Sequence, residues 1–434
     1  MVKFPLIAMP KLTVITKNRF LFCCAAILFR VLLDFSYSFV IAGVFASEGY
    51  VFDLDFAQYI ASWLVYFLYL PLVKDELIKV SDYFFTTSLL AIIAPLTSLY
   101  GLDAARPILP VISVFAAILL IHFVVSVKMV SFKRLPTIKH GRRIVIFISL
   151  FFVIFLVVWY FALGVKLTMN FSEVYEIRAM NAERTAGGFL AYTNNWTYQI
   201  FNIFLMAFAL YYRRYLIFLF FFLVQVYFFA ASGHKTVLFL PVLVLGVWIY
   251  FRKFSSLVVV PAMFGVLIVI SLMSFFIFDD IWMLSLFARR LFYVPADLTF
   301  IYFDFFSNNT KVLWSNSVLA NFISYPYDTD IPHVVGRYMG KEEMAANNGF
   351  ISSGYAHAGI LGVLFYSLIL GIILRFINDT TTGTLPVWLA VTLSIVPLRA
   401  VLISSDLFTV MLTHGFIVAI ILIFLARYKN DDKT

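Results

Sequence analysis

Two adjacent arginines, Arg289 and Arg290, lie in the longest polar segment of a chain that is otherwise strongly apolar. The guanidinium group of arginine binds two phosphate oxygens in parallel and stays protonated at physiological pH. The pair therefore suits a pyrophosphate carried by a lipid, although arginines that snorkel to ordinary lipid phosphates show the same pattern. Arg337, further along the segment, is another candidate for phosphate binding.

Two histidines are candidates for a general base, because imidazole exchanges protons near neutral pH. His333 follows Pro332 within the polar segment, where most histidines have no chemical role. His357 lies about two turns into the next apolar run, where an ionisable side chain is costly unless it has partners. We therefore favour a functional role for His357 over a purely structural polar contact.

Three further cations are candidates for phosphate binding. Arg178 belongs to a segment of mixed charge, so a solvated loop is the simpler interpretation. Lys235 follows an apolar run, and a snorkelling cation explains it as well as a phosphate ligand does. Arg399 lies near the end of an apolar run without a local partner, so a polar cavity beside it is the functional interpretation.

The polar segment ends with Asn347, Asn348 and Gly349, and Tyr355 follows shortly afterwards. Aromatic rings stack on the apolar faces of sugars, so Tyr355 and the two asparagines are candidates for contacts with a saccharide. Packing within a folded loop explains these residues equally well.

Arg30 and Asp34 are four residues apart in the first apolar run, so on a helix they share one face. An unpaired charge at the centre of a membrane helix costs about 2.5–3.5 kcal/mol. The sequence therefore predicts an ion pair with a structural role.

The composition of the chain indicates that the elements carrying these residues lie in a lipid bilayer. The chain has 434 residues, of which 63% are hydrophobic and 13% charged, and its mean hydropathy is +0.97. A water-soluble domain could not bury so much apolar surface. The net charge is +9, but the basic residues lie between apolar runs and form no basic domain, so we expect contact with lipid head groups and no nucleic-acid partner.

About twelve apolar runs approach the roughly 20 residues that a bilayer-spanning helix needs. They fall at about 20–46, 56–73, 80–102, 107–127, 144–165, 189–211, 215–231, 236–251, 255–278, 350–374, 386–403 and 407–426. The first is too long for the core of a cleaved signal peptide, so we expect a retained signal anchor. The sequence predicts an all-α polytopic membrane protein with one membrane domain over 1–434 and two large loops, 166–188 and 279–349.

The basic residues indicate the orientation of the helices, because loops on the cytoplasmic side carry an excess of Lys and Arg. Alternate connections are rich in them, and so are the two ends of the chain. Examples are Lys74, Lys79, Lys133, Arg142, Arg143, Arg213, Arg214, Arg252, Lys253 and Arg375. The pattern predicts that both termini are cytoplasmic and that the loops 166–188 and 279–349 are external.

Several kinds of chemistry have no motif in this chain. There is no Walker-type Gly-Lys-Ser/Thr loop, which argues against ATP hydrolysis, and no ligand spacing typical of a zinc or calcium site. No cytoplasmic segment is large enough to bind a nucleotide sugar. We therefore expect no metal or cofactor, and an enzyme of this design would take its activated substrate from the membrane.

This pattern resembles the O-antigen polymerases of the Wzy type. The likeness rests on about twelve helices with both termini inside, on large third and fifth external loops, and on three local stretches. These stretches are Ser232 to Thr236, Arg290 to Pro295, and Asn347-Asn348-Gly349-Phe350-Ile351 continuing through His357 to Gly362. The topological likeness covers nearly the whole chain, whereas the specific residues are few.

The resemblance implies a metal-independent glycosyltransferase of the GT-C type in the bacterial inner membrane, with its active site on the periplasmic face. Both donor and acceptor would be oligosaccharides on undecaprenyl pyrophosphate, and a Wzz-type chain-length regulator and a flippase would be partners. Arginines would stabilise the leaving pyrophosphate, and a base would activate one sugar hydroxyl. Arg289, Arg290 and Arg337 are the candidates for the pyrophosphates, and His357, His333 or a loop carboxylate for the base.

Two other functions remain open. The related O-antigen ligase shares this topology and donor, and only the acceptor, lipid A core, separates it from the polymerase. A transporter or flippase of lipid-linked oligosaccharide belongs to a different class, in which paired halves, short loops and a charged cavity at mid-membrane are usual. The chain has neither visible halves nor uniformly short loops, whereas Arg30, Asp34, His122 and Arg399 keep a charged cavity in consideration.

Overall fold

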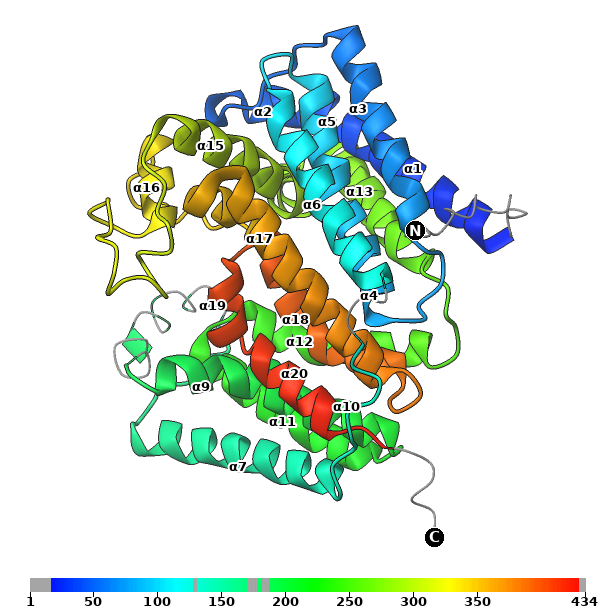
Figure 1. Ribbon diagram of the computed structural model, residues 1–434, viewed down its shortest axis with the longest axis vertical. Helices are drawn as coiled ribbons and strands as arrows, with labels where there is room; N and C mark the ends of the chain where they lie inside the picture. The colour runs from blue at the N-terminus through cyan, green and yellow to red at the C-terminus, as the bar shows by residue number, and fades with distance from the viewer. Residues whose placement is uncertain are drawn as a thin grey trace, which may run out of the picture.

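The computed structural model describes residues 17–127, 131–170, 173, 176, 178, 180, 181 and 187–428. Within these residues the fold is built from helices, without strands (Figure 1). The α-helices are α1 (Lys17–Ser36), α2 (Ala42–Val44), α3 (Phe56–Tyr69), α4 (Val80–Ser88), α5 (Ala94–Leu102), α6 (Ile108–Ser126), α7 (Gly141–Ala162), α9 (Leu190–Trp196), α10 (Asn202–Tyr211), α11 (Tyr215–Ser232), α12 (Lys235–Phe251), α13 (Val259–Phe278), α14 (Ile281–Leu284), α15 (Val294–Asn308), α16 (Ile331–Tyr338), α17 (Phe350–Thr381), α18 (Val387–Ile403), α19 (Leu407–Leu412) and α20 (Phe416–Leu425).

Four π-helical segments continue some of these helices. They are η1 (Tyr37–Ile41), η4 (Leu89–Ile93), η5 (Thr197–Phe201) and η6 (Ser285–Tyr293). Two short 3₁₀ turns, η2 (Ala46–Glu48) and η3 (Leu70–Leu72), follow α2 and α3. A π segment has more residues per turn than an α-helix, so it changes which side chains share a face.

Seven helices of the described chain are long and apolar enough to cross a membrane, which supports a polytopic membrane protein. They are Lys17–Val44, Val80–Leu102, Ile108–Ser126, Gly141–Ala162, Tyr215–Ser232, Val259–Phe278 and Phe350–Thr381. Shorter apolar helices cover Phe56–Leu72, Lys235–Phe251, Val387–Ile403 and Phe416–Leu425. Twelve crossings therefore stay a prediction, as does the location of the two ends, which lie largely outside the described residues.

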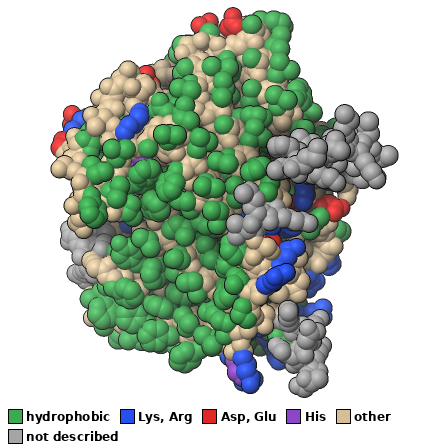
Figure 2. All heavy atoms as spheres, viewed as in Figure 1, with side chains coloured by type: hydrophobic (Ala, Val, Ile, Leu, Met, Phe, Trp, Pro, Cys, Tyr) green, Lys and Arg blue, Asp and Glu red, His purple; other side chains and the backbone are tan. Residues whose placement is uncertain are grey.

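The helices form two groups that meet along α17 and α18 (Figure 1). The upper bundle contains α1, α3, α5, α6 and α13, and the lower bundle contains α7 and α9–α12. α17 packs along α6, whereas α18 contacts both α4 of the upper side and α10 of the lower bundle. Figure 2 shows hydrophobic side chains over most of one face, with Lys and Arg gathered mainly towards its right and lower right. This distribution is the one that a bilayer-embedded protein needs.

The polar segment 279–349 is folded over much of its length. It forms α14, η6, α15 and α16, and α15 packs against α17 and α5. Asp297 of α15 is buried and receives a hydrogen bond of 2.6 Å from Arg106. About half of the predicted loop 166–188 lies outside the described residues.

Two predicted helices are interrupted in the structure. The run 350–374 becomes α17, which breaks at Ala358 and Gly359, and Gly359 has a φ of +61° that suits glycine. Gly354 and Gly362 face each other across this break, because a Cβ on Gly362 would lie 2.0 Å from the Gly354 carbonyl oxygen. The run 407–426 divides into α19 and α20 before Gly415, whose φ is +71°. Each break includes one glycine with a positive φ.

The predicted pair of Arg30 and Asp34 is confirmed. Their side chains form a buried ion pair between the helices of the upper bundle. Arg30 also donates to Ser62 and Thr97 at 3.3 Å each. Asp34 accepts a hydrogen bond of 2.5 Å from Ser98. Both charges are therefore satisfied within the packing of α1, α3 and α5.

Candidate functional site at the break of α17

The break of α17 places His357 at the end of a short helix rather than inside a continuous one. The carbonyl oxygens of Ala356 and His357 accept hydrogen bonds from the backbone N–H groups of Val312 and Leu313, each at 3.0 Å. The loop after α15 thus occupies the position of the missing helical turn. Leu313 and Trp314 have φ angles of 50° and 57°, which cost energy for residues other than glycine. Such strain persists only where the surrounding structure enforces it, and it occurs often at functional sites.

His357 is buried, with 1% of its surface exposed, and both of its ring nitrogens have partners. Nδ1 accepts a hydrogen bond of 3.1 Å from the backbone N–H of Trp314, and the two rings stack with centroids 5.1 Å apart. Nε2 lies 3.4 Å from Oδ2 of Asp406. Because Nδ1 is an acceptor, a neutral imidazole carries its proton on Nε2, facing the carboxylate.

Asp406 lies between α18 and α19 and connects the other members of the site. Oδ1 caps α19 by accepting from the N–H groups of Phe408 and Thr409, at 2.8 and 3.3 Å. Oδ2 accepts a hydrogen bond of 2.7 Å from the hydroxyl of Tyr366. Tyr366 in turn accepts one of 2.8 Å from Nε1 of Trp314. We call Trp314, His357, Tyr366 and Asp406 the His357 cluster.

The side chain of Asp406 is more exposed to solvent than that of its partner His357. Its side chain is 24% exposed, whereas that of His357 is 2% exposed. Burial favours the neutral acid, but the hydrogen bonds from His357, Tyr366 and the backbone of Phe408 outweigh it and hold the pKa of Asp406 below its ordinary value. Asp406 is therefore an ionised carboxylate with a fixed orientation.

Lys311 is a cation close to this cluster. Its ammonium group donates to the carbonyl oxygen of Phe306 and lies 4.5 Å from the ring of Tyr355. Partial burial lowers the pKa of Lys311. Tyr355 itself is buried and stacks on Phe303 with ring centroids 3.7 Å apart. Tyr355 was predicted to contact a sugar, but here its ring packs within the protein.

Three of the predicted polar residues already have partners in the protein. Arg289 is buried on η6, forms an ion pair of 2.5 Å with Glu48 and lies 4.1 Å from the ring of Phe45. Arg337 forms an exposed ion pair of 2.9 Å with Asp328. His333 pairs with Asp330 at the surface. Phosphate binding by Arg289 would require its ion pair to open.

Arg290 differs from its neighbour. It is exposed, and within the described part of the chain its side chain has no hydrogen bond or ion pair. Along α14 and η6 the exposed residues Trp282, Leu286 and Arg290 recur every fourth position, whereas Arg289 is buried. The two arginines are neighbours in the sequence, but Arg289 lies on the buried face of the helix and Arg290 on the exposed face.

Arg399 is the one exposed residue of α18, and no ion pair joins it to the rest of the described chain. α18 is surrounded by α4, α10, α12, α17 and α20. Tyr83 and His414 lie within electrostatic range of Arg399. The polar cavity beside Arg399 stays a prediction.

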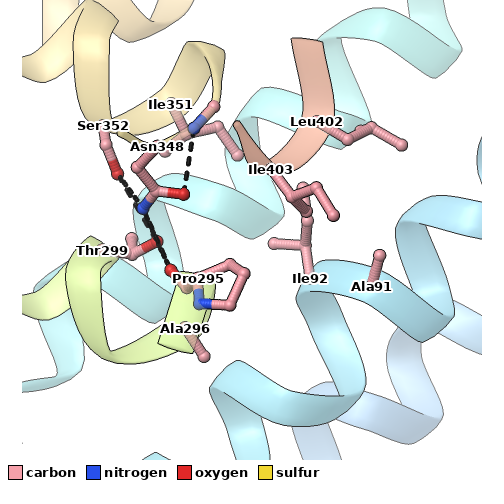
Figure 3. A pocket seen from close by; sticks show the side chains of 11 residues that line it. Ala91, Ile92, Pro295, Ala296, Thr299, Asn348, Ile351, Ser352, Leu402 and Ile403 are labelled. Atoms are coloured by element: carbon pink, nitrogen blue, oxygen red, sulfur yellow. Dashed lines mark hydrogen bonds between the residues drawn. The ribbon is translucent and has the colours of Figure 1, made fainter. Parts of the chain in front are cut away.

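Asn348 occupies the junction between α15, α17, α18 and η4 (Figure 3). Its amide nitrogen donates to the carbonyl oxygen of Pro295 at 3.0 Å, to Thr299 at 3.1 Å and to Ser352 at 2.8 Å. The cavity beside it has a volume of about 10 Å³, which suits one water molecule and not a sugar. Asn348 therefore holds the helices together, whereas Asn347 is exposed.

Arg178 and Lys235 lie near the end of the lower bundle. Arg178 is exposed, and Lys235 begins α12. Burial and the charge of Arg178 lower the pKa of His234 to about 4, so His234 is neutral at physiological pH. The described contacts do not join Arg178 or Lys235 to the His357 cluster.

Sequence reasoning singled out His357 but not its partner Asp406. Asp406 precedes an apolar run, which is the position of a helix N-cap, and this is the one signal that could have drawn attention to it. Within the described residues there is no group of three or more His, Cys, Asp or Glu side chains that could hold a metal ion. Comparison of the chain with protein-family models, curated proteins and solved structures gives no match.

Proposed function

We propose that the protein polymerises oligosaccharide repeat units carried on undecaprenyl pyrophosphate, working at the periplasmic face of the bacterial inner membrane. The observation that carries this proposal is Asp406, an ionised and partly exposed carboxylate whose orientation is fixed by the buried His357. A glycosyl transfer between lipid-linked sugars needs a proton acceptor at the attacking hydroxyl and positive charge at the leaving pyrophosphate.

In the proposed reaction, a hydroxyl oxygen of the acceptor sugar attacks the anomeric carbon of the donor. The bond between that carbon and the pyrophosphate oxygen breaks, and the leaving undecaprenyl pyrophosphate keeps the electron pair. Asp406 accepts the proton of the attacking hydroxyl, while His357 holds the carboxylate in place. The sequence-based candidate for the base was His357 itself, but its ring is buried whereas Asp406 is partly exposed, which favours a positioning role for His357.

Arg290 and Arg399 are the proposed ligands of the pyrophosphate groups. Both are exposed and lack an ion-pair partner among the described residues, so binding a phosphate requires no existing contact to break. Arg290 precedes Pro295 by just over one turn, and Arg399 precedes Leu402 by less than one turn. Pro295 and Leu402 both line the small cavity at the helix junction (Figure 3), so the elements that carry the two arginines meet there.

This proposal includes twelve membrane crossings with both termini in the cytoplasm and a GT-C type of fold. The interrupted helix α17 would cross the membrane with its break towards the periplasm. The excess of Lys and Arg in alternate connections supports this orientation. The chain-length regulator and the flippase that accompany such polymerases would be its partners.

Reconstitution in liposomes tests the proposed function. Purified protein is supplied with undecaprenyl-pyrophosphate-linked repeat units, and the products are separated by length. We expect glycans of several repeats without added nucleotide or metal. Transfer only to added lipid A core would identify a ligase, and movement of lipid-linked units between leaflets without longer glycan would identify a transporter. Either result would overturn the proposal.

A further inference from the structure

A second polar cavity lies at the other end of α17, away from the His357 cluster. Its volume is about 380 Å³, which falls in the range of small-molecule sites. It lies between the start of α4, the ends of α6 and α17, and the segment that follows α6. From Gly359 to Arg375 the helix runs roughly 24 Å, so the cavity and the His357 cluster lie near opposite faces of a bilayer.

The two carboxylates that line the cavity are already neutralised. Asp82 accepts hydrogen bonds from the backbone N–H groups of Ile78 and Lys79, at 3.1 and 2.8 Å, and lies 3.4 Å from the ammonium group of Lys74. Asp379 accepts from the N–H of Phe132 at 3.0 Å and pairs with Arg375 at 3.2 Å. The negative charge of both carboxylates is therefore compensated by contacts within the protein.

Two cations of the cavity have no such partner. Within the described residues neither Lys79 nor Lys133 takes part in an ion pair, and both line the cavity. Arg375 is engaged elsewhere, because it donates to the carbonyl oxygens of Val125 and Val127 at 2.7 and 2.8 Å. The cavity thus has an excess of positive charge carried by Lys79 and Lys133.

The remaining lining supplies hydrogen-bond donors. The hydroxyl groups of Ser126 and Ser131 and the imidazole of His122 border the same space. Lysine ammonium groups combined with hydroxyls suit a phosphate, which offers several acceptor oxygens and negative charge. Where this end of the helices meets the head groups of a membrane, phosphate is the commonest anion.

We infer that this cavity binds a phosphate group, with Lys79 and Lys133 as its cationic contacts. The phosphate belongs either to an anionic phospholipid of the adjacent leaflet or to a soluble phosphate from the cytosol. The inference is independent of the proposed glycosyltransferase activity, since the cavity shares no residue with the His357 cluster.

Binding to the delipidated full-length protein in detergent tests this inference. The probes are dioctanoyl phosphatidylglycerol, dioctanoylglycerol without a phosphate, and inorganic phosphate compared with chloride at equal ionic strength. Native mass spectrometry measures lipid binding, and the thermal unfolding midpoint reports inorganic phosphate. Binding of the phospholipid alone identifies a lipid source, whereas stabilisation by inorganic phosphate identifies a soluble source.

The double variant Lys79→Gln/Lys133→Gln should weaken the observed binding at least tenfold. The matched control, Lys139→Gln/Lys253→Gln, removes the same charge from exposed positions outside the cavity and should bind as the unaltered protein does. Lys79→Arg/Lys133→Arg keeps the charge and should retain binding. Should the first variant fail to fold, Ser131→Trp fills the cavity while keeping both lysines and should also lose binding.

Equal binding by the cavity variant and its control would overturn the inference, because the lysines would then act only as general surface charge. Equal binding of dioctanoylglycerol and phosphatidylglycerol would also overturn it, since no phosphate would be recognised. The same holds if neither phosphate probe binds the unaltered protein.

Discussion

Nε2 of His357 lies 3.4 Å from Oδ2 of Asp406, although the two residues belong to different helical segments. His357 ends the first part of α17, and Asp406 caps α19. The buried ring of His357 holds the carboxylate of Asp406 in place. The carboxylate itself is partly exposed to solvent. This relationship is the basis of the proposed chemistry.

Replacement of His357 by Phe should keep the aromatic stack with Trp314 but remove the hydrogen bond to Asp406. Since that hydrogen bond lowers the pKa of Asp406, the acid limb of the pH–kcat profile should move to higher pH. We expect kcat at neutral pH to fall about tenfold, which is less than the roughly 100-fold or more that loss of the general base itself would cost. His333→Phe, at the surface, is the control and should change neither quantity. An unshifted acid limb would contradict the positioning role.

Arg290→Ala and Arg289→Ala should have different effects although the residues are adjacent. Arg290 is exposed and unpaired within the described chain, so its removal should leave the unfolding midpoint unchanged and lower kcat by about 100-fold. Arg289→Ala removes the ion pair of 2.5 Å with Glu48, which keeps only its longer contact of 3.8 Å with Lys341, and should lower the unfolding midpoint. The rate of polymer formation gives kcat, and thermal unfolding in detergent gives the unfolding midpoint of each variant. Normal glycan from Arg290→Ala would remove its assignment to pyrophosphate.

Gly349→Ala should disturb the junction between α17 and α18. An added Cβ would lie 2.0 Å from the carbonyl oxygen of Leu402, so the two helices must separate. We expect a loss of about 1–3 kcal/mol of stability, as for other overpacked sites. Gly246→Ala is the matched control, because open space surrounds that position in α12. Chemical denaturation in mixed micelles measures the free energy of unfolding of both variants. Equal values would show that α17 and α18 approach each other less closely than the structure indicates.

The stability of the protein should depend on pH through Asp406. Its pKa in the folded protein lies below its ordinary value, so the ionised form stabilises the fold above the unfolded pKa. This contribution is lost as the pH falls through the folded pKa. The unfolding midpoint should therefore drop as the pH falls below about 4, the ordinary value for aspartate, and drop less in Asp406→Asn. The exposed Asp53→Asn serves as control, and identical acid losses in both variants would contradict the expectation.

The apolar helices could be predicted because lipid requires long stretches without charge, and composition records this directly. The breaks at Gly359 and before Gly415 could not, because a glycine within an apolar run also occurs in unbroken membrane helices. The folded character of 279–349 follows from its buried aromatic residues, such as Tyr302 and Phe306 of α15. The residues that these aromatic side chains contact depend on tertiary packing and could not be predicted from the sequence.

The candidate site was only partly visible in the sequence. His357 drew attention because a buried imidazole needs partners, and it has them. Asp406 is far from it along the chain, so no local pattern predicts their contact. Arg289 and Arg290 are chemically identical neighbours, and only the helix face distinguishes the paired arginine from the unpaired one.

Single-turnover glycan transfer by Asp406→Asn in liposomes tests the central claim most directly. Asparagine keeps the shape and can still cap α19 through its side-chain oxygen, but it cannot accept the proton. We predict that the rate of transfer falls by at least about 100-fold, while lipid-linked donor still binds and the protein remains folded. Transfer at the rate of the unaltered protein would contradict the assignment of Asp406 as the base.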